Sequence, residues 1–252
     1  MFIDTHCHLT DRYTKPDELD TIVNDAKSAG VGALVCACAE PDDFETAIKI
    51  TEKYKNIFCT IGIHPEYSEK VDDLVLPDHI LENSKVIGVG EIGLDYHFGI
   101  DNKNAQIELF EKQLAIAKKH NLPVAIHTRD AESDTISILD DSVSGVMHCF
   151  TGSWNLAKTM LDRGFFISAS GILTFKNSVE LRETFAKIPT DRIVIETDSP
   201  WCAPVPYRGK PCTPALVVET ARVMAEIKNL QLDELESILE SNTKKLYPKI
   251  VL

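Results

Sequence analysis

FIDTHCH, residues 2–8, is a short apolar run that ends in two histidines on either side of a cysteine. In an extended strand, the side chains at positions i and i+2 point the same way. His6 and His8 are therefore expected to project from one face, with Cys7 turned to the other. Two imidazoles that converge at the end of a strand form half of a metal site, so the other half should lie elsewhere in the chain.

Similar apolar runs alternate with helical stretches along the whole sequence. They are almost continuously apolar, which is typical of parallel strands covered on both faces. We expect strands at residues 2–5, 31–37, 57–61, 86–90, 123–127, 144–148, 165–168 and 192–196. We expect helices at residues 17–29, 42–54, 104–120, 154–163 and 178–187, and an extra C-terminal helix within residues 230–252 on the outside of the fold.

Eight strand–helix units in 252 residues match the count and length of an α/β fold of the (β/α)8 TIM barrel type, with an extra C-terminal helix. An open doubly wound sheet is the alternative, and its dinucleotide-binding version lacks a GxGxxG motif after the first strand. The chain has no evident linker, low-complexity tract or internal repeat, so residues 1–252 are predicted to form a single domain.

The composition is that of a soluble globular protein, with 44% apolar and 26% charged residues. No targeting segment or apolar run of about 20 residues is evident, so we expect a cytoplasmic protein without a membrane partner. The seven cysteines are an odd number in mostly apolar segments, which favours free thiols. The net charge of −13 argues against an extensive nucleic-acid surface and, by itself, favours a small-molecule enzyme.

Metal-ligating side chains concentrate at the ends of the predicted strands, where TIM barrels form their active sites. Five of the eight histidines lie there, together with a glutamate and an aspartate. The candidate ligands are His6, His8, Glu91, His127, His148 and Asp198, and His64 ends the third strand. This set exceeds the needs of one tetrahedral zinc, so two divalent ions bridged by a carboxylate fit better. Glu91 is the natural bridge.

The motifs around these residues resemble those of the TatD-family metal-dependent deoxyribonucleases, within the amidohydrolase-like TIM barrels. The matching stretches are DTHCHL (4–9), GIHPE (62–66), GEIGLDYH (90–97), IHTRDA (126–131), HCFTG (148–152), ETDSPW (196–201), RGK (208–210) and NTKKLY (242–247). The resemblance implies hydrolysis of phosphodiester bonds in DNA, typically from the 3′ end. Two divalent metal ions of the Zn, Mg or Mn type are the expected cofactors, and the ligands do not choose among them.

The resemblance also implies roles for single positions. His6, His8, Glu91 and Asp198 resemble the ligands of one metal, and Glu91, His127 and His148 resemble those of the second. Asp198 and Glu91 are the implied catalytic residues, and Asp198 could also accept the proton of the attacking water. His64 resembles a position near the scissile phosphate. The sequence departs from the family's usual residues at Thr128, Ser199, Trp201 and Pro211-Cys212, none of which is a metal ligand.

Loops after the strands supply the candidate substrate contacts. Arg129 could clamp a phosphate through its planar guanidinium, or pair with Asp130 instead. Trp201 could stack on a base or pack within its loop. Arg208 lies in a predicted loop on the same face, as do Lys176 and Lys210. So few basic residues suit DNA that is single-stranded or has a frayed 3′ end rather than long duplex. No motif reads the 2′-hydroxyl, which leaves RNA open.

Two other functions compete with this reading. A metal-dependent hydrolase of a small amide, lactone or phosphoester is the main alternative. Barrels of that kind often bridge their metals with a carbamylated lysine on the fourth strand, whereas here Glu91 occupies that strand end and residues 88–98 contain no lysine. The second alternative is a binding protein with an inactive site, and the presence of every expected metal ligand argues against it. Without a long exposed apolar stripe, we expect a monomer.

Overall fold

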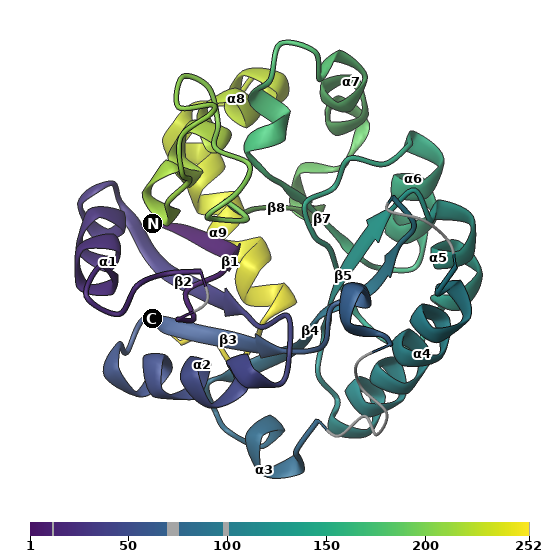
Figure 1. Ribbon diagram of the computed structural model, residues 1–252. Coiled ribbons are helices and arrows are strands. Elements are labelled where there is room, and N and C mark those ends of the chain that lie inside the picture. The colour runs from purple at the N-terminus through teal and green to yellow at the C-terminus, as the bar shows by residue number, and fades with distance from the viewer. Residues whose placement is uncertain (12, 70–75, 98–100, 252) are drawn as a thin grey trace.

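Eight parallel strands form the centre of the computed structural model, which describes residues 1–11, 13–69, 76–97 and 101–251 (Figure 1). Each strand pairs with the next one along the chain, in the order β1 to β8. The strands are β1 (Phe2–Cys7), β2 (Val31–Ala37), β3 (Ile57–Ile61), β4 (Val86–Asp95), β5 (Val124–Arg129), β6 (Gly145–Met147), β7 (Phe166–Ala169) and β8 (Ile193–Ile195).

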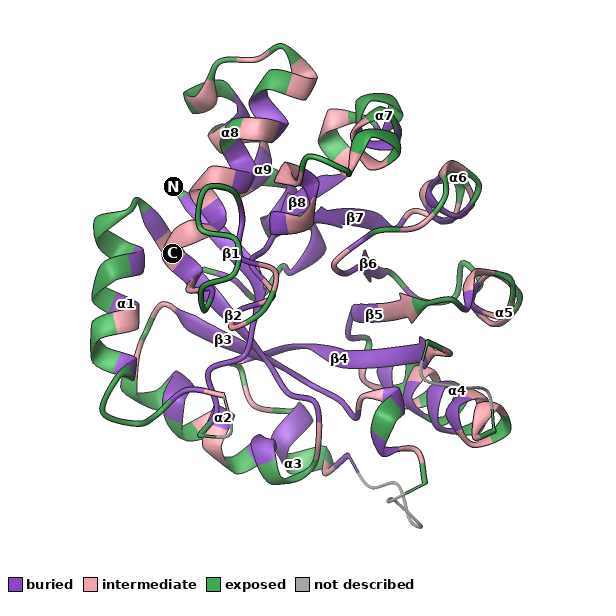
Figure 2. Ribbon diagram, turned by 45° about the horizontal axis from the view of Figure 1, so that its top comes forward, coloured by how far each residue is buried: buried purple, intermediate pink, exposed green. Residues whose placement is uncertain are grey.

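Helices surround these strands and turn their exposed sides outward (Figure 2). Local sequence signals set their ends: for example, the Ser153 hydroxyl caps α6 by accepting a hydrogen bond of 3.2 Å from the Leu156 N–H. The helices are α1 (Leu19–Ser28), α2 (Asp42–Lys53), α3 (Asp78–Leu81), α4 (Lys103–His120), α5 (Glu132–Ile138), α6 (Trp154–Asp162), α7 (Val179–Lys187), α8 (Val217–Lys228) and α9 (Leu232–Leu246). Among the residues described, none of them has both the length and the apolar character to cross a membrane.

The residues just after β8 close the ring of strands against the end of β1. The Asp198 N–H donates to the His6 carbonyl at 2.9 Å, and the His8 N–H donates to the Ser199 carbonyl at 2.8 Å. The buried Asp4 carboxylate adds to this seam, because it accepts a hydrogen bond of 2.9 Å from the Thr197 N–H. The expected TIM barrel is therefore confirmed, and its closure brings residue 198 next to residues 6 and 8.

Alternate positions of the strands face two separate apolar cores. Residues such as Leu34 and Cys36 pack against the surrounding helices, whereas Ala33 and Val35, on the same strand, face the barrel interior. Cys7 belongs to the outer core, so β1 turns it away from His6 and His8, as the alternation predicts. The strands are buried on both sides for this reason, which explains their continuous apolar character.

The expected extra C-terminal helix is confirmed as α9, but the residues at its end do not pack only on the outside. Helix α9 packs against β1 and β8 (Figure 1), and the residues at its end enter the interior core. Leu246, Tyr247 and Ile250 contact the inward-facing side chains of the strands, and Tyr247 is fully buried. This segment therefore lies partly inside the barrel wall rather than only outside it. Its apolar residues cover the interior core that short parallel strands leave open at one end.

Strand β4 is longer than its apolar run predicts. We expected it to end at residue 90, but it continues to Asp95 because Gly93, Leu94 and Asp95 pair with residues 127, 128 and 129 of β5. Gly93 adopts a φ of 143°, a conformation that favours glycine, and an added Cβ there would lie 2.0 Å from the His127 carbonyl oxygen. The extension carries two acidic side chains, Glu91 and Asp95, to the same end of the barrel.

Candidate two-metal centre

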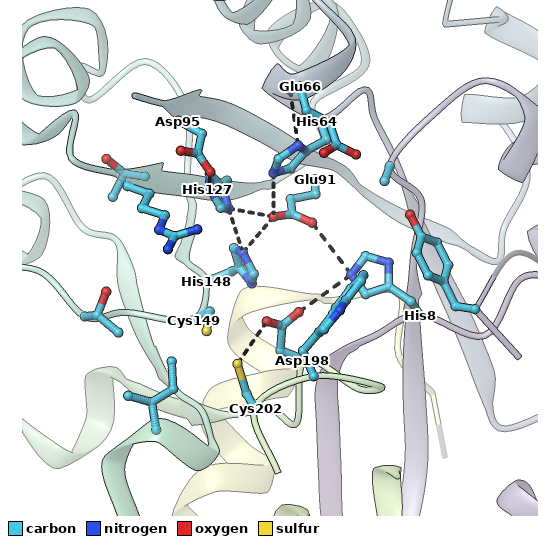
Figure 3. Close-up of a pocket in the computed structure, with 17 residues that line it drawn as sticks. His8, His64, Glu66, Glu91, Asp95, His127, His148, Cys149, Asp198 and Cys202 are labelled. Carbon is cyan, nitrogen blue, oxygen red and sulfur yellow. Dashed lines mark hydrogen bonds and ion pairs between the residues drawn. The ribbon is translucent and has the colours of Figure 1, made fainter. Parts of the chain in front are cut away.

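A cavity of about 740 Å³ opens at the C-terminal ends of the strands. Five of the six candidate ligands line it, namely His8, Glu91, His127, His148 and Asp198. His6 is buried beneath them, with its Nε2 atom 3.3 Å from that of His8. The structure thus brings together every side chain that the strand ends predicted as a metal ligand, and Figure 3 shows the five that line the cavity.

The Glu91 carboxylate lies between two groups of these side chains, with one oxygen toward each (Figure 3). Its Oε2 atom is 3.5 Å from His6 Nε2 and 3.7 Å from His8 Nε2. Asp198 completes this first group, because its Oδ1 atom is 3.6 Å from His8 Nε2 and 3.9 Å from His6 Nε2.

The second group surrounds the other oxygen of Glu91. The Oε1 atom lies 2.8 Å from His127 Nδ1 and 2.8 Å from His148 Nε2. The Nε2 atom of His64 is 3.7 Å from the same oxygen, so His64 borders this group without being as close as the other two histidines. A bidentate carboxylate between two sets of nitrogen and oxygen donors is an arrangement that suits a pair of divalent cations.

Two acidic residues orient the histidines of the second group, and sequence reasoning did not assign either of them a role. Asp95 Oδ2 lies 3.1 Å from His127 Nε2, so His127 can offer only Nδ1 to a cation. Glu196 Oε1 lies 3.1 Å from His148 Nδ1, which leaves Nε2 for the centre. Such outer carboxylates fix the orientation of metal-ligating histidines. Asp95 shares a strand face with Glu91, and Glu196 precedes Asp198 by two residues; these spacings were the available signals.

Burial and charge act in opposite directions on these groups. Burial lowers the pKa of His6, which favours the neutral imidazole that a metal requires. Burial opposes ionisation of Glu91, but the nearby His148 and His64 hold the pKa of its carboxyl well below the ordinary value. Although burial alone would lower the pKa of His148, Glu91 and Glu196 outweigh it and raise that pKa well above its usual range. A cation bound here would replace the proton of His148.

Comparison with known proteins places this chain in one family. The family described as "TatD related DNase" matches residues 3–248. The chain belongs to the TatD-related DNase family. The uncharacterized metal-dependent hydrolase YabD of Bacillus subtilis is 37% identical, over 98% of this chain and 99% of that protein. The uncharacterized metal-dependent hydrolase YcfH of Escherichia coli is 34% identical, over 98% and 96%.

Solved TatD-family structures have the same architecture. The TatD homologue YjjV from Escherichia coli superposes with a TM-score of 0.86, at 30% identity over 98% of both chains. A TatD-family hydrolase from Entamoeba histolytica superposes with a TM-score of 0.85, at 26% identity over 99% of this chain and 98% of that one. The protein is therefore a metal-dependent hydrolase of the TatD family, built on an amidohydrolase-like TIM barrel.

The relatives are named as metal-dependent hydrolases, and the donor set of this TatD-family chain is consistent with a two-metal site. His127 Nδ1 lies 2.8 Å from Glu91 Oε1, and His127 Nε2 lies 3.1 Å from Asp95 Oδ2, so the ring lies between two carboxylates. Although burial opposes protonation of His127, Asp95 and Glu91 raise its pKa, and a cation bound at Nδ1 would take the place of the proton there. Buried clusters of histidine and carboxylate, such as His6, His8 and Asp198, also lie within reach of a common ion. Mixed nitrogen and oxygen ligands suit zinc or manganese, and carboxylates admit magnesium.

The predicted substrate contacts are placed unequally around the cavity. His64, Arg129 and Trp201 line it. Trp201 is 48% exposed, and its ring meets that of His8 edge-on at 5.0 Å. Tyr13, which sequence reasoning missed, packs against both rings, at 5.2 Å from Trp201 and 4.9 Å from His8. No motif in the sequence marks Tyr13.

Arg208 lies outside the cavity wall, as do Lys176 and Lys210. The Arg208 guanidinium stacks over the ring of Phe175, 4.5 Å from its centroid. At the cavity rim, Asp130 Oδ2 lies 2.9 Å from His97 Nδ1. Of the basic side chains predicted as phosphate contacts, Arg129 is therefore the one in the cavity wall.

Proposed function

We propose that this TatD-family protein is a deoxyribonuclease that hydrolyses phosphodiester bonds as a 3′–5′ exonuclease on single-stranded or frayed ends. The observation that carries the proposal is the Glu91 carboxylate, with Oε2 toward His6 and His8 and Oε1 toward His127 and His148. Family membership supports a DNA substrate. The phosphodiester is anionic, and two cations bridged by a carboxylate would be suited to promoting the attack of water on its phosphorus.

The proposed ligand sets follow the two oxygens of Glu91. His6, His8, Asp198 and Glu91 would hold one cation, and His127, His148 and Glu91 would hold the other. Bound divalent cations supply neutralisation of the phosphate charge and a lower pKa for a coordinated water. Zinc, manganese and magnesium remain the candidates, and their availability in the cell decides among them.

The chain's own residues would carry the remaining steps. Asp198 is placed to accept the proton of the attacking water, because its carboxylate borders the cavity and the two first-strand histidines. Nearby imidazoles outweigh burial and keep the pKa of Asp198 below its usual value, so the carboxylate is available as a base. Arg129 would clamp a non-bridging oxygen, and His64 would lie close to the phosphate.

The aromatic pair Tyr13 and Trp201 supports an unpaired substrate end. An exposed indole ring at the cavity mouth offers a surface on which a single base can stack, irrespective of its identity. A base inside a duplex is not free to do so. Arg129 as the basic residue of the cavity wall fits a short phosphate contact and not a long duplex track.

The activity is tested with metal-loaded protein and single-stranded DNA labelled at its 5′ end. We expect products that shorten from the 3′ end, and almost none from closed circular duplex. The double variant His6→Ala/His8→Ala should lose the activity while keeping its circular dichroism spectrum. His79→Ala, an exposed histidine remote from the cavity, serves as the matched control. Comparable rates on closed circular duplex and on frayed ends would rule out the end preference.

A parallel panel separates the nuclease from the small-molecule hydrolase. Metal-loaded protein is assayed on RNA of the same sequence and on small esters, lactones and amides. We expect DNA to be the preferred substrate. Turnover of a lactone or amide without any of DNA would replace the proposal by the alternative. Gel filtration in the same buffers tests the expected monomer. We also propose that residues 1–252 form a single-domain enzyme of the cytoplasm.

A further inference from the structure

Asp198 has a second oxygen that faces away from the histidines and toward two thiols (Figure 3). Its Oδ1 atom lies 3.6 Å from His8 Nε2, whereas its Oδ2 atom lies 3.5 Å from Cys202 Sγ. The ligand atoms of Cys149, Asp198 and Cys202 all lie within 4.8 Å of one another. All three residues line the cavity, so solvent and ions can reach them. Sequence reasoning treated both cysteines as structural thiols.

The backbone holds these three residues in an uncommon conformation. Cys149, Asp198 and Cys202 have φ values of 40°, 55° and 54°, in the left-handed region that side chains other than glycine rarely adopt. Hydrogen bonds hold them there: the Cys149 N–H donates to Glu196 at 2.6 Å, and the Trp201 N–H donates to the Asp198 carbonyl at 2.9 Å. Backbone conformations of this kind concentrate at functional sites.

We propose that Cys149, Cys202 and Asp198 form a third cation site, beside the two-metal centre, for a thiophilic divalent cation such as Zn²⁺. Two sulfurs and one carboxylate oxygen are three ligands of a tetrahedral zinc, and the open cavity leaves the fourth position to water. Each thiol releases its proton to solvent when the cation binds. Magnesium, which prefers oxygen ligands, does not compete for two thiolates.

The proposal goes beyond the nuclease activity and does not depend on it. The two sites share Asp198, with Oδ1 on the side of the histidines and Oδ2 on the side of the thiols. A cation bound by the thiols would therefore share the Asp198 carboxylate with the two-metal centre.

The site is tested by metal titration of the stripped protein in a non-chelating reductant. Titration with Co²⁺ should give a sulfur-to-cobalt charge-transfer band in the wild-type protein, because thiolate ligation produces this absorption. The band should be absent from the double variant Cys149→Ser/Cys202→Ser and weakened in each single variant. Cys212→Ser is the matched control: this buried thiol lies outside the three-residue cluster, and its loss should leave the band unchanged.

Equilibrium dialysis against Zn²⁺ supplies the second measurement. The wild-type protein should bind one equivalent more than the double variant, whatever the two-metal centre itself holds. A wild-type protein without the charge-transfer band, or an equal stoichiometry in both proteins, would overturn the proposal. A wild-type protein that shows the sulfur-to-cobalt band but does not cleave DNA would count against the proposed function alone, because the cobalt titration uses no substrate. If the double variant misfolds, the single variants supply the comparison, and circular dichroism checks that they are folded.

Discussion

Asp95 decides which nitrogen of His127 faces the centre. Its carboxylate lies 3.1 Å from His127 Nε2, and His127 Nδ1 lies 2.8 Å from Glu91. An amide at position 95 can present its NH₂ group to the same ring nitrogen and thereby favour the wrong tautomer. We predict that Asp95→Asn weakens metal binding about 10- to 100-fold, the usual range for loss of an outer-shell partner. Isothermal titration with Mn²⁺ measures this change.

Asp130→Asn is the matched control for this substitution. Asp130 also bonds to a histidine, His97, but this pair is exposed at the rim of the cavity. The control variant should keep the wild-type affinity. Equal affinities for Mn²⁺ in the wild-type protein and the Asp95→Asn variant would show that Asp95 does not orient a ligand.

A lysine from a different helix caps the C-terminal end of helix α7. Lys228, on α8, donates from its Nζ atom to the carbonyls of Phe185, Ala186 and Ile188, which helix α7 leaves without partners at its C-terminus. Methionine at position 228 keeps the apolar stem but removes the donors. We predict that Lys228→Met lowers the free energy of unfolding by about 1–3 kcal/mol, measured by urea denaturation.

Lys245→Met, on the exposed side of helix α9, is the comparison for the Lys228 variant. Surface substitutions of this kind change stability by about 0.5 kcal/mol or less. The same small effect at both positions would mean that water replaces Lys228 at the end of α7 without loss. Neither variant should change metal binding, because both positions are remote from the cavity.

We expect the stability of the barrel to depend on the residues at the end of α9 and just after it. Tyr247 is fully buried and packs, with Leu246 and Ile250, against the inward-facing side chains of the strands. Tyr247→Ala would leave a void in the interior core that the parallel strands cannot collapse to fill. We predict a loss of about 3–5 kcal/mol in the free energy of unfolding, the range found for large aromatic side chains cut back to alanine.

Val251→Ala is the control for this loss, since Val251 is 83% exposed four residues further along. Its stability should match that of the wild-type protein. If Tyr247→Ala is equally stable, the C-terminal segment covers the barrel without supporting it. Thermal unfolding of both variants, followed by circular dichroism, distinguishes the two cases.

Local patterns predicted much of this architecture, and the misses share a cause. The apolar runs located all eight strands, because burial on both faces leaves a continuous signal in the sequence. The C-terminal end of β4 and the packing at the end of the C-terminal segment were misjudged, since both depend on pairing or packing with distant residues. The role of Asp95 was missed for the same reason: residues 91–95 become strand only because β5 pairs with them.

By itself, the sequence determined the barrel, the TatD-family motifs and the set of candidate ligands, since strand periodicity and residue type are local properties. The tertiary structure alone decided how these side chains meet. The seam between β1 and the residues after β8 brings Asp198 to His6 and His8, and the extension of β4 places Glu91 between two groups of histidines. Cys149, after β6, and Cys202, after β8, come together because the C-terminal ends of parallel strands converge on one face of a barrel.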